Sequence, residues 1–188
     1  MTQQQITILL AIVAVVIVSV ALGFVLTRKR RSQRLRERFG PEYDRVVRKE
    51  RGVRRAEEVL EIRAKRRQKF VISPLEPAIS SDFTERWRVV QTQFVDDPKG
   101  SVSEADQLVS EVMKARGYPM ADFEQRADDL SVDHPILVEN YRIAHDIALR
   151  HKKGEASTED LRKAMVHYRS LFEELIELSL PERKEARG

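Results

Sequence analysis

The hydrophobic and polar positions of the chain divide it into three regions, of which the first is a continuous apolar run. This run, ITILLAIVAVVIVSVALGFVLT, covers residues 6–27 and contains no charged side chain. As a helix it would be about 33 Å long, which matches a bilayer hydrocarbon core of roughly 30 Å. A helix also satisfies its own backbone hydrogen bonds, as lipid requires. The run therefore predicts a transmembrane anchor within residues 1–27.

The second region, residues 28–69, predicts a basic helical arm. Gly40-Pro41 is typical of a helix start, and pairs such as Asp44 and Arg48 favour one helix over about 41–68. An apolar seam along this helix is interrupted by charged residues, so it is thinner than the seam of a coiled coil. A solvated spacer helix, a homo-oligomer formed through residues 41–68, and docking along a partner all remain open. The seam positions are Phe39, Tyr43, Val46, Glu50, Val53, Glu57, Leu60, Ala64 and Arg67.

The third region has apolar residues at helical spacing and no strand-like alternation of useful length. It predicts five amphipathic helices, at about 82–96, 102–116, 120–130, 135–151 and 158–179. Ser101 and Glu104 have the spacing of a capping box for the second of these helices, and Asp133 is expected to cap the fourth. Residues 70–80, which contain two prolines, predict a linker.

The expected fold is therefore all-α. It consists of one N-terminal transmembrane helix, a long juxtamembrane helix, and a compact bundle of about five helices in residues 81–180. Residues 181–188 are expected to form a disordered tail.

Charge is distributed unevenly between these regions. Residues 28–69 hold 18 Lys and Arg against 7 Asp and Glu, whereas residues 70–188 hold 16 against 23, and the whole chain has a net charge of +4. A basic arm joined to an acidic domain predicts either a negatively charged partner for the arm or attraction between the two parts.

The basic block after the apolar run predicts topology. MTQQQ, before the run, lacks the positive charge of a signal peptide, and RKRR follows the run in place of a cleavage site. Positive charge stays on the cytoplasmic side, so we expect a single pass with the N-terminus outside. The same charges favour anionic lipid head groups. The predicted lipid-binding residues are Arg28, Lys29, Arg30 and Arg31. Nucleic acid is a less favoured partner, because the segment offers no aromatic stacking platform.

Candidate chemistry is sparse. There is no cysteine, no glycine-rich phosphate loop and no nucleophile elbow. Neither His145 nor His167 has the Glu-x-x-His spacing of a di-iron bundle. No cofactor, metal site or catalytic residue is therefore assigned. The alternative that stays open is a membrane-tethered, metal-dependent enzyme or sensor that uses the Asp133/His134 loop with His145 or His167.

The densest polar segment is FEQRADDLSVDHP, residues 123–135. A solvated helix face with a capped turn explains it, and so does a recognition surface for a protein partner. On the second interpretation, the predicted partner-binding residues are Arg126, Asp129, Asp133, His134, Glu139 and Tyr141.

Several segments together resemble an uncharacterised bacterial family of short single-pass membrane proteins. They are RLRERFGPEYDRVV, RWRVVQTQFVDDP, EVMKARGYP, FEQRADDLSVDHP, VENYRIAHDIALRH and STEDLRKAMVHYRSLFEEL. The resemblance implies an N-terminal membrane segment, a similar helical domain and a location in the bacterial plasma (inner) membrane. It implies no activity and no catalytic residues. Together with the pattern it predicts a membrane-anchored adaptor whose bundle faces the cytoplasm.

Overall fold

The structure, a computed structural model, describes residues 3–177, except for the side chains of residues 3, 5–15 and 18. Within the described range it is all-helical, with eight helices and no strand, which confirms the expected fold class. The predicted tail, residues 181–188, lies outside the described residues. The helices are α1 (Gln3–Phe39), α2 (Pro41–Glu50), α3 (Val53–Arg67), α4 (Pro77–Gln93), α5 (Pro98–Ala115), α6 (Phe123–Asp133), α7 (Leu137–Lys152) and α8 (Thr158–Glu177).

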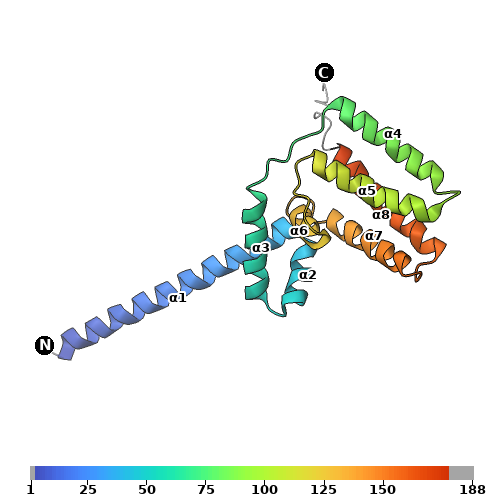
Figure 1. The fold of residues 1–188 in the computed structure, drawn as a ribbon. Coiled ribbons are helices and arrows are strands. Elements are labelled where there is room, and N and C mark those ends of the chain that lie inside the picture. The colour runs from blue at the N-terminus through green and yellow to red at the C-terminus, as the bar shows by residue number, and fades with distance from the viewer. Residues whose placement is uncertain (1–2, 178–188) are drawn as a thin grey trace, which may run out of the picture.

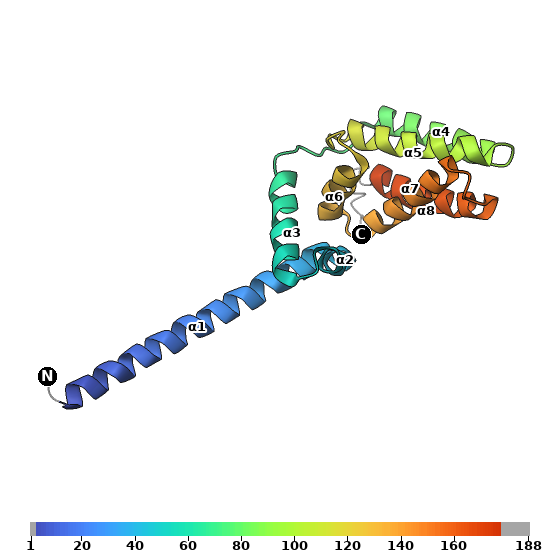
Figure 2. The same ribbon diagram turned by 60° about the horizontal axis from the view of Figure 1, so that its bottom comes forward.

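Helix α1 carries the predicted anchor and projects from the rest of the molecule as an isolated rod (Figures 1 and 2). Its described apolar side chains between Val16 and Leu26 are exposed, and Phe24 is 67% exposed. Among the described residues, no helix meets the length and apolarity needed to cross a bilayer. Half of the predicted span, residues 6–15 and 18, has no described side chains. The anchor therefore stays a prediction.

The arm differs from the single helix expected over 41–68. It forms two helices, α2 and α3, which fold back on one another at Arg51 and Gly52. Arg51 adopts a left-handed conformation with φ of 54°, which ends α2. The turn lets α2 and α3 bury their apolar faces against each other, whereas a straight helix would leave them in water. Most of the predicted seam becomes a small core with α1 and α6. Its buried members are Leu35, Phe39, Tyr43, Val46, Ala56, Leu60, Ala64 and Val132.

Helices α4 to α8 form the predicted bundle around a second, larger core (Figure 1). At its centre the ring of Trp87 stacks on that of Phe172, with centroids 4.7 Å apart. Helix α4 begins at Pro77, inside the predicted linker of residues 70–80. Two predicted helix caps were also wrong. Asp97 caps α5 by accepting from the Gly100 amide, so the Ser101/Glu104 capping box is not used. Asp133 ends α6 and does not cap α7, because its carboxylate is held by other groups.

The segment between α3 and α4 is fixed to the bundle. The Ser73 amide donates to the carbonyl of Arg116, and Leu75 is buried in the bundle core. Gly117 adopts a φ of +98° where the chain passes the carbonyl of Val71. This segment therefore connects the two cores without separating them.

Candidate functional site

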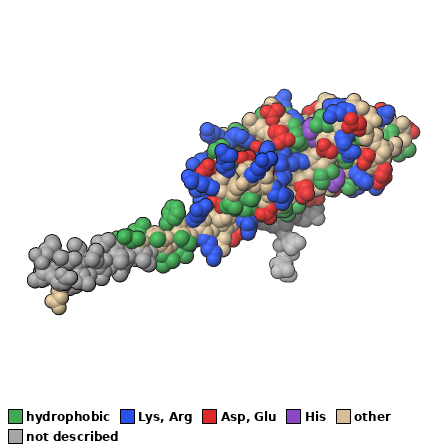
Figure 3. All heavy atoms as spheres, turned by 90° about the horizontal axis from the view of Figure 1, so that it is seen from below, with side chains coloured by type: hydrophobic (Ala, Val, Ile, Leu, Met, Phe, Trp, Pro, Cys, Tyr) green, Lys and Arg blue, Asp and Glu red, His purple; other side chains and the backbone are tan. Residues whose placement is uncertain are grey.

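Exposed positive charge gathers at the place where α1 joins the body. We call it the basic collar, and Figure 3 shows Lys and Arg side chains gathered there. It continues the apolar surface of α1, and its side chains come from α1, from the turn at Arg51 and from α3. Its members are Arg28, Lys29, Arg30, Arg31 and Arg34 of α1, Arg51, and Arg54, Arg55 and Lys65 of α3.

Two hollows open between α1 and α3 inside the collar. One, of about 380 Å³, is lined by Phe24, Arg28 and Arg31 of α1 and by Arg54 and two glutamates of α3. The other, of about 340 Å³, is lined by arginines of α1 and by Glu61. Between them the Arg31 Nε lies 2.6 Å from the Glu61 carboxylate and joins the two helices.

The arm is bonded to the acidic bundle by arginines at the end of α3. Arg66 donates to the Asp129 carboxylate over 2.7 Å, and Arg67 donates to Asp133. The hydroxyl of Tyr118 also donates to Asp133, over 3.1 Å. Of the two explanations for the uneven charge, attraction between the parts is therefore realised in the fold.

Next to these pairs lies a cluster of charged groups around Glu42, which is only 3% exposed. The Glu42 carboxylate accepts from Arg63 over 2.8 Å and lies 3.1 Å from Arg45 and 3.2 Å from Arg142. Asp128 completes the cluster, 2.8 Å from Arg63 and 3.2 Å from Arg142. Because these residues come from α2, α3, α6 and α7, the cluster fixes how the arm sits on the bundle.

Burial shifts the ionisation of groups in this interface. Desolvation raises the pKa of Asp129, although the Arg66 guanidinium opposes the shift. Desolvation also raises the pKa of Tyr118, and the neighbouring Asp133 adds to it. Both shifts mean that burial disfavours the charged form of each group relative to water. At Asp129 the contact with Arg66 offsets part of that cost.

The six predicted partner-binding residues do not share one accessible face. Asp129 and Tyr141 are fully buried, with Tyr141 packed on the Phe123 ring at 4.8 Å. Asp133 is bonded within the chain, and Arg126 and His134 are half-buried. Glu139 is exposed. The sequence could not distinguish a carboxylate used inside the fold from one that is free to meet a partner.

The histidines have separate partners. His134 lies 3.7 Å from Glu174, and desolvation lowers its pKa. His145 stacks on Phe123 and lies 3.9 Å from Asp106, whereas His167 bonds to Asn140 over 3.0 Å. Within the described part of the chain, no group of three His, Asp or Glu side chains has the arrangement of a metal site.

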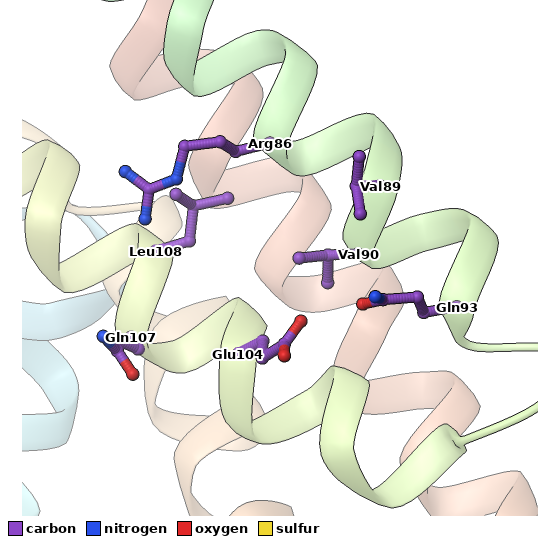
Figure 4. A pocket seen from close by; sticks show the side chains of 7 residues that line it. All are labelled: Arg86, Val89, Val90, Gln93, Glu104, Gln107 and Leu108. Atoms are coloured by element: carbon purple, nitrogen blue, oxygen red, sulfur yellow. The ribbon is translucent and has the colours of Figure 1, made fainter.

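Two further hollows lie on the bundle. A cleft of about 690 Å³ opens between α2, α6 and α7, next to Arg45, Arg142 and His145. A groove of about 400 Å³ runs between α4 and α5 (Figure 4). Val90 and Leu108 lie between these two helices, and Gln93, Glu104 and Gln107 also line the groove. Arg86 in the same groove is paired with Glu111 at 2.5 Å.

Comparison with known proteins adds no assignment, since no family model, curated protein or solved structure matches this chain. The sequence did not reveal that Glu42, Arg63 and Arg142 belong to one buried cluster of charged groups. A signal for Glu42 was present: it lies on the same face of its helix as Tyr43 and Val46, so a helix that buries these side chains also buries the carboxylate.

Proposed function

We propose that this protein is a single-pass membrane protein whose helical bundle faces the cytoplasm and binds a protein partner. The apolar run of residues 6–27 is the anchor, and Arg28, Lys29, Arg30 and Arg31 contact anionic lipid head groups. With its resemblance to a bacterial family, this gives a location in the bacterial inner membrane, with the N-terminus outside.

One observation carries this proposal. The described apolar side chains of α1 from Val16 to Leu26 are exposed, and the basic collar follows at once. A contiguous exposed apolar surface of this kind marks a protein or membrane contact. Apolar surface followed by a positively charged flank is the arrangement expected of a membrane helix and its cytoplasmic boundary.

The bundle supplies the adaptor part of the proposal. The arm neutralises much of the acidic surface of α6, so a partner must bind elsewhere on the bundle. Glu139 is the predicted partner residue that keeps an exposed carboxylate. No coordination geometry among the described residues supports the metal-dependent alternative at the Asp133/His134 loop.

The first test is capture of the full-length protein from its native membrane after mild crosslinking. We expect one near-stoichiometric protein partner, which is lost in Glu139→Arg because the charge on the contact is reversed. Asp96→Arg, which also reverses an exposed charge, in the turn after α4, is the matched control and should retain the partner. Capture without any reproducible protein, or equal capture by both variants, contradicts the adaptor proposal as drawn.

The anchor has a separate test, which uses the absence of native cysteine. Thr2→Cys and Lys153→Cys place single thiols on either side of the predicted span. In intact cells, a membrane-impermeant maleimide should label position 2 and leave position 153 unlabelled until the cells are opened. Equal labelling of both positions in intact cells excludes the proposed topology.

A further inference from the structure

Helix α3 has an outward face that neither core uses. Counting around the helix, this face is opposite the buried residues Ala56, Leu60 and Ala64. Three of its five side chains are basic and one is acidic, and Ile62 in its middle is 62% exposed. We call it the outer face of α3; it consists of Arg54, Arg55, Glu58, Ile62 and Lys65. Arg51, in the turn before α3, adds a further exposed positive charge.

This face lies beside the end of the apolar segment of α1. Arg54 and Glu58 line the same hollow as Phe24 and Arg28, so the start of α3 is level with the last turns of the apolar run. Glu61, one turn further along α3, is paired with Arg31. Both views show α3 crossing α1 steeply where the projecting rod meets the body (Figures 1 and 2).

We propose that the outer face of α3 lies on the head-group layer of an anionic bilayer leaflet, as a second contact beside the anchor. This inference rests on the proposed function, because α1 must be inserted for α3 to reach the lipid surface. A helix that crosses the anchor at its cytoplasmic end lies along the membrane plane when the anchor stands upright.

The chemistry of the face fits lipid phosphate. Basic side chains near a negatively charged leaflet are attracted to it over a Debye length, and guanidinium groups bind phosphate oxygens in pairs. The exposed Ile62 supplies an apolar contact at the level where head groups meet acyl chains, as in interfacial helices. The two hollows beside α1 give lipid phosphates a place among Arg28, Arg31 and Arg54.

This contact also sets the orientation of the bundle. Because α3 is bonded to α6 through Arg66 and Asp129, a surface-bound α3 holds the bundle at one angle to the membrane. The anchor by itself would allow the body to rotate and tilt. The lipid composition of the leaflet thereby controls which side of the bundle faces a partner.

The test uses the full-length protein in vesicles with a single fluorophore at Ile62→Cys. Vesicles contain either phosphatidylcholine alone or equal amounts of phosphatidylcholine and phosphatidylglycerol. We expect the label to be protected from an aqueous quencher in the anionic vesicles only, and to lose protection as salt is raised. A label at Val95→Cys, in the distant turn after α4, should remain accessible in both.

Charge substitutions sharpen the test. Arg54→Ala with Arg55→Ala should weaken the contact measured at position 62 by about fivefold for each basic side chain removed. Lys152→Ala with Lys153→Ala, which removes the same charge at the far end of α7, should leave it unchanged. A result in which both double variants behave alike overturns the proposal.

The outcomes separate this inference from the proposed function. Protein that floats with both kinds of vesicle, but whose label at position 62 stays as accessible as that at 95, keeps the anchor and overturns the lipid contact of α3. Protein that floats with neither overturns both. Equal protection in the two vesicles overturns the anionic chemistry, and displacement of α3 from anionic vesicles by duplex DNA assigns the face to nucleic acid instead.

Discussion

At the scale of single residues, the buried charges between arm and bundle are what the fold depends on most. Arg63 is 3% exposed and contacts both Glu42 and Asp128. Buried ions are tolerated when each is paired and hydrogen-bonded, and removal of one partner leaves the other desolvated. The positions of these residues are therefore more restricted than those of the many exposed arginines.

We expect Arg63→Ala to destabilise the protein by about 3 kcal/mol, because it removes the buried arginine that Glu42 and Asp128 share. Urea unfolding of the detergent-solubilised full-length chain measures the change. Arg88→Ala, which removes an arginine from an exposed pair with Glu85, is the control and should have no measurable effect. If the two variants lost a comparable free energy of unfolding, Arg63 would not be the buried, paired charge described above.

At the scale of elements, a few turns between helices determine where the chain changes direction. The turn at Arg51 and Gly52 separates α2 from α3, and Gly117 lets the chain leave α5 close beside the linker. Both glycines were visible in the sequence, yet Gly52 alone did not predict a break. Helical charge pairs on either side of it favoured a continuous helix, and burial of Tyr43, Val46 and Leu60 outweighs them by a larger free energy.

Gly117→Ala tests the close approach at the end of α5. The added methyl group would meet the Val71 carbonyl, and the left-handed conformation is unfavourable for alanine as well. Gly154→Ala has the same conformational cost, about 1 kcal/mol, but its methyl group meets nothing. We expect Gly117→Ala to lower the midpoint of urea unfolding at least twice as far as Gly154→Ala does. Equal shifts of the two midpoints would argue against the close contact with Val71.

At the scale of the whole molecule, the arm and the bundle are two cores joined by ion pairs. We call the pairs of Arg66 with Asp129 and of Arg67 with Asp133 the joint. The joint brings together segments of the chain that are more than sixty residues apart. Together with the linker contacts it holds the body as one unit at the end of α1, which is the geometry that a lipid-dependent orientation needs. Because charge pairs dock the arm on the bundle, substitutions at these pairs should change how the two cores unfold.

We therefore expect the two cores to unfold together in the native chain and separately when the joint is broken. Trp87, the only tryptophan, reports the bundle, and a fluorophore at Arg48→Cys reports the arm. Their urea transitions should coincide. With Arg66→Glu and Arg67→Glu, like charges face Asp129 and Asp133, so the arm should unfold at lower urea. Lys114→Glu is the control, and transitions that stay coincident in the double variant would contradict the role of the joint.

The sequence by itself determined the elements whose signals are local. Five helical periods in residues 81–180, the apolar run, and the basic block all follow from side chains near one another in the chain, and the all-α class and the five helices are confirmed. The anchor, the topology and the partner stay predictions.

Only the tertiary structure decided which charges are available. Asp129 and Asp133 look like surface residues in their local sequence, but the packing of α3 on α6 buries Asp129 and pairs both carboxylates with arginines. Tyr141 is taken up by the core of the bundle. The tertiary structure also turns one spacer helix into a hairpin and so brings the outer face of α3 beside the end of α1. Such contacts depend on the free energy of packing between segments that are distant in the sequence. The helical periodicity of one segment carries no information about that free energy.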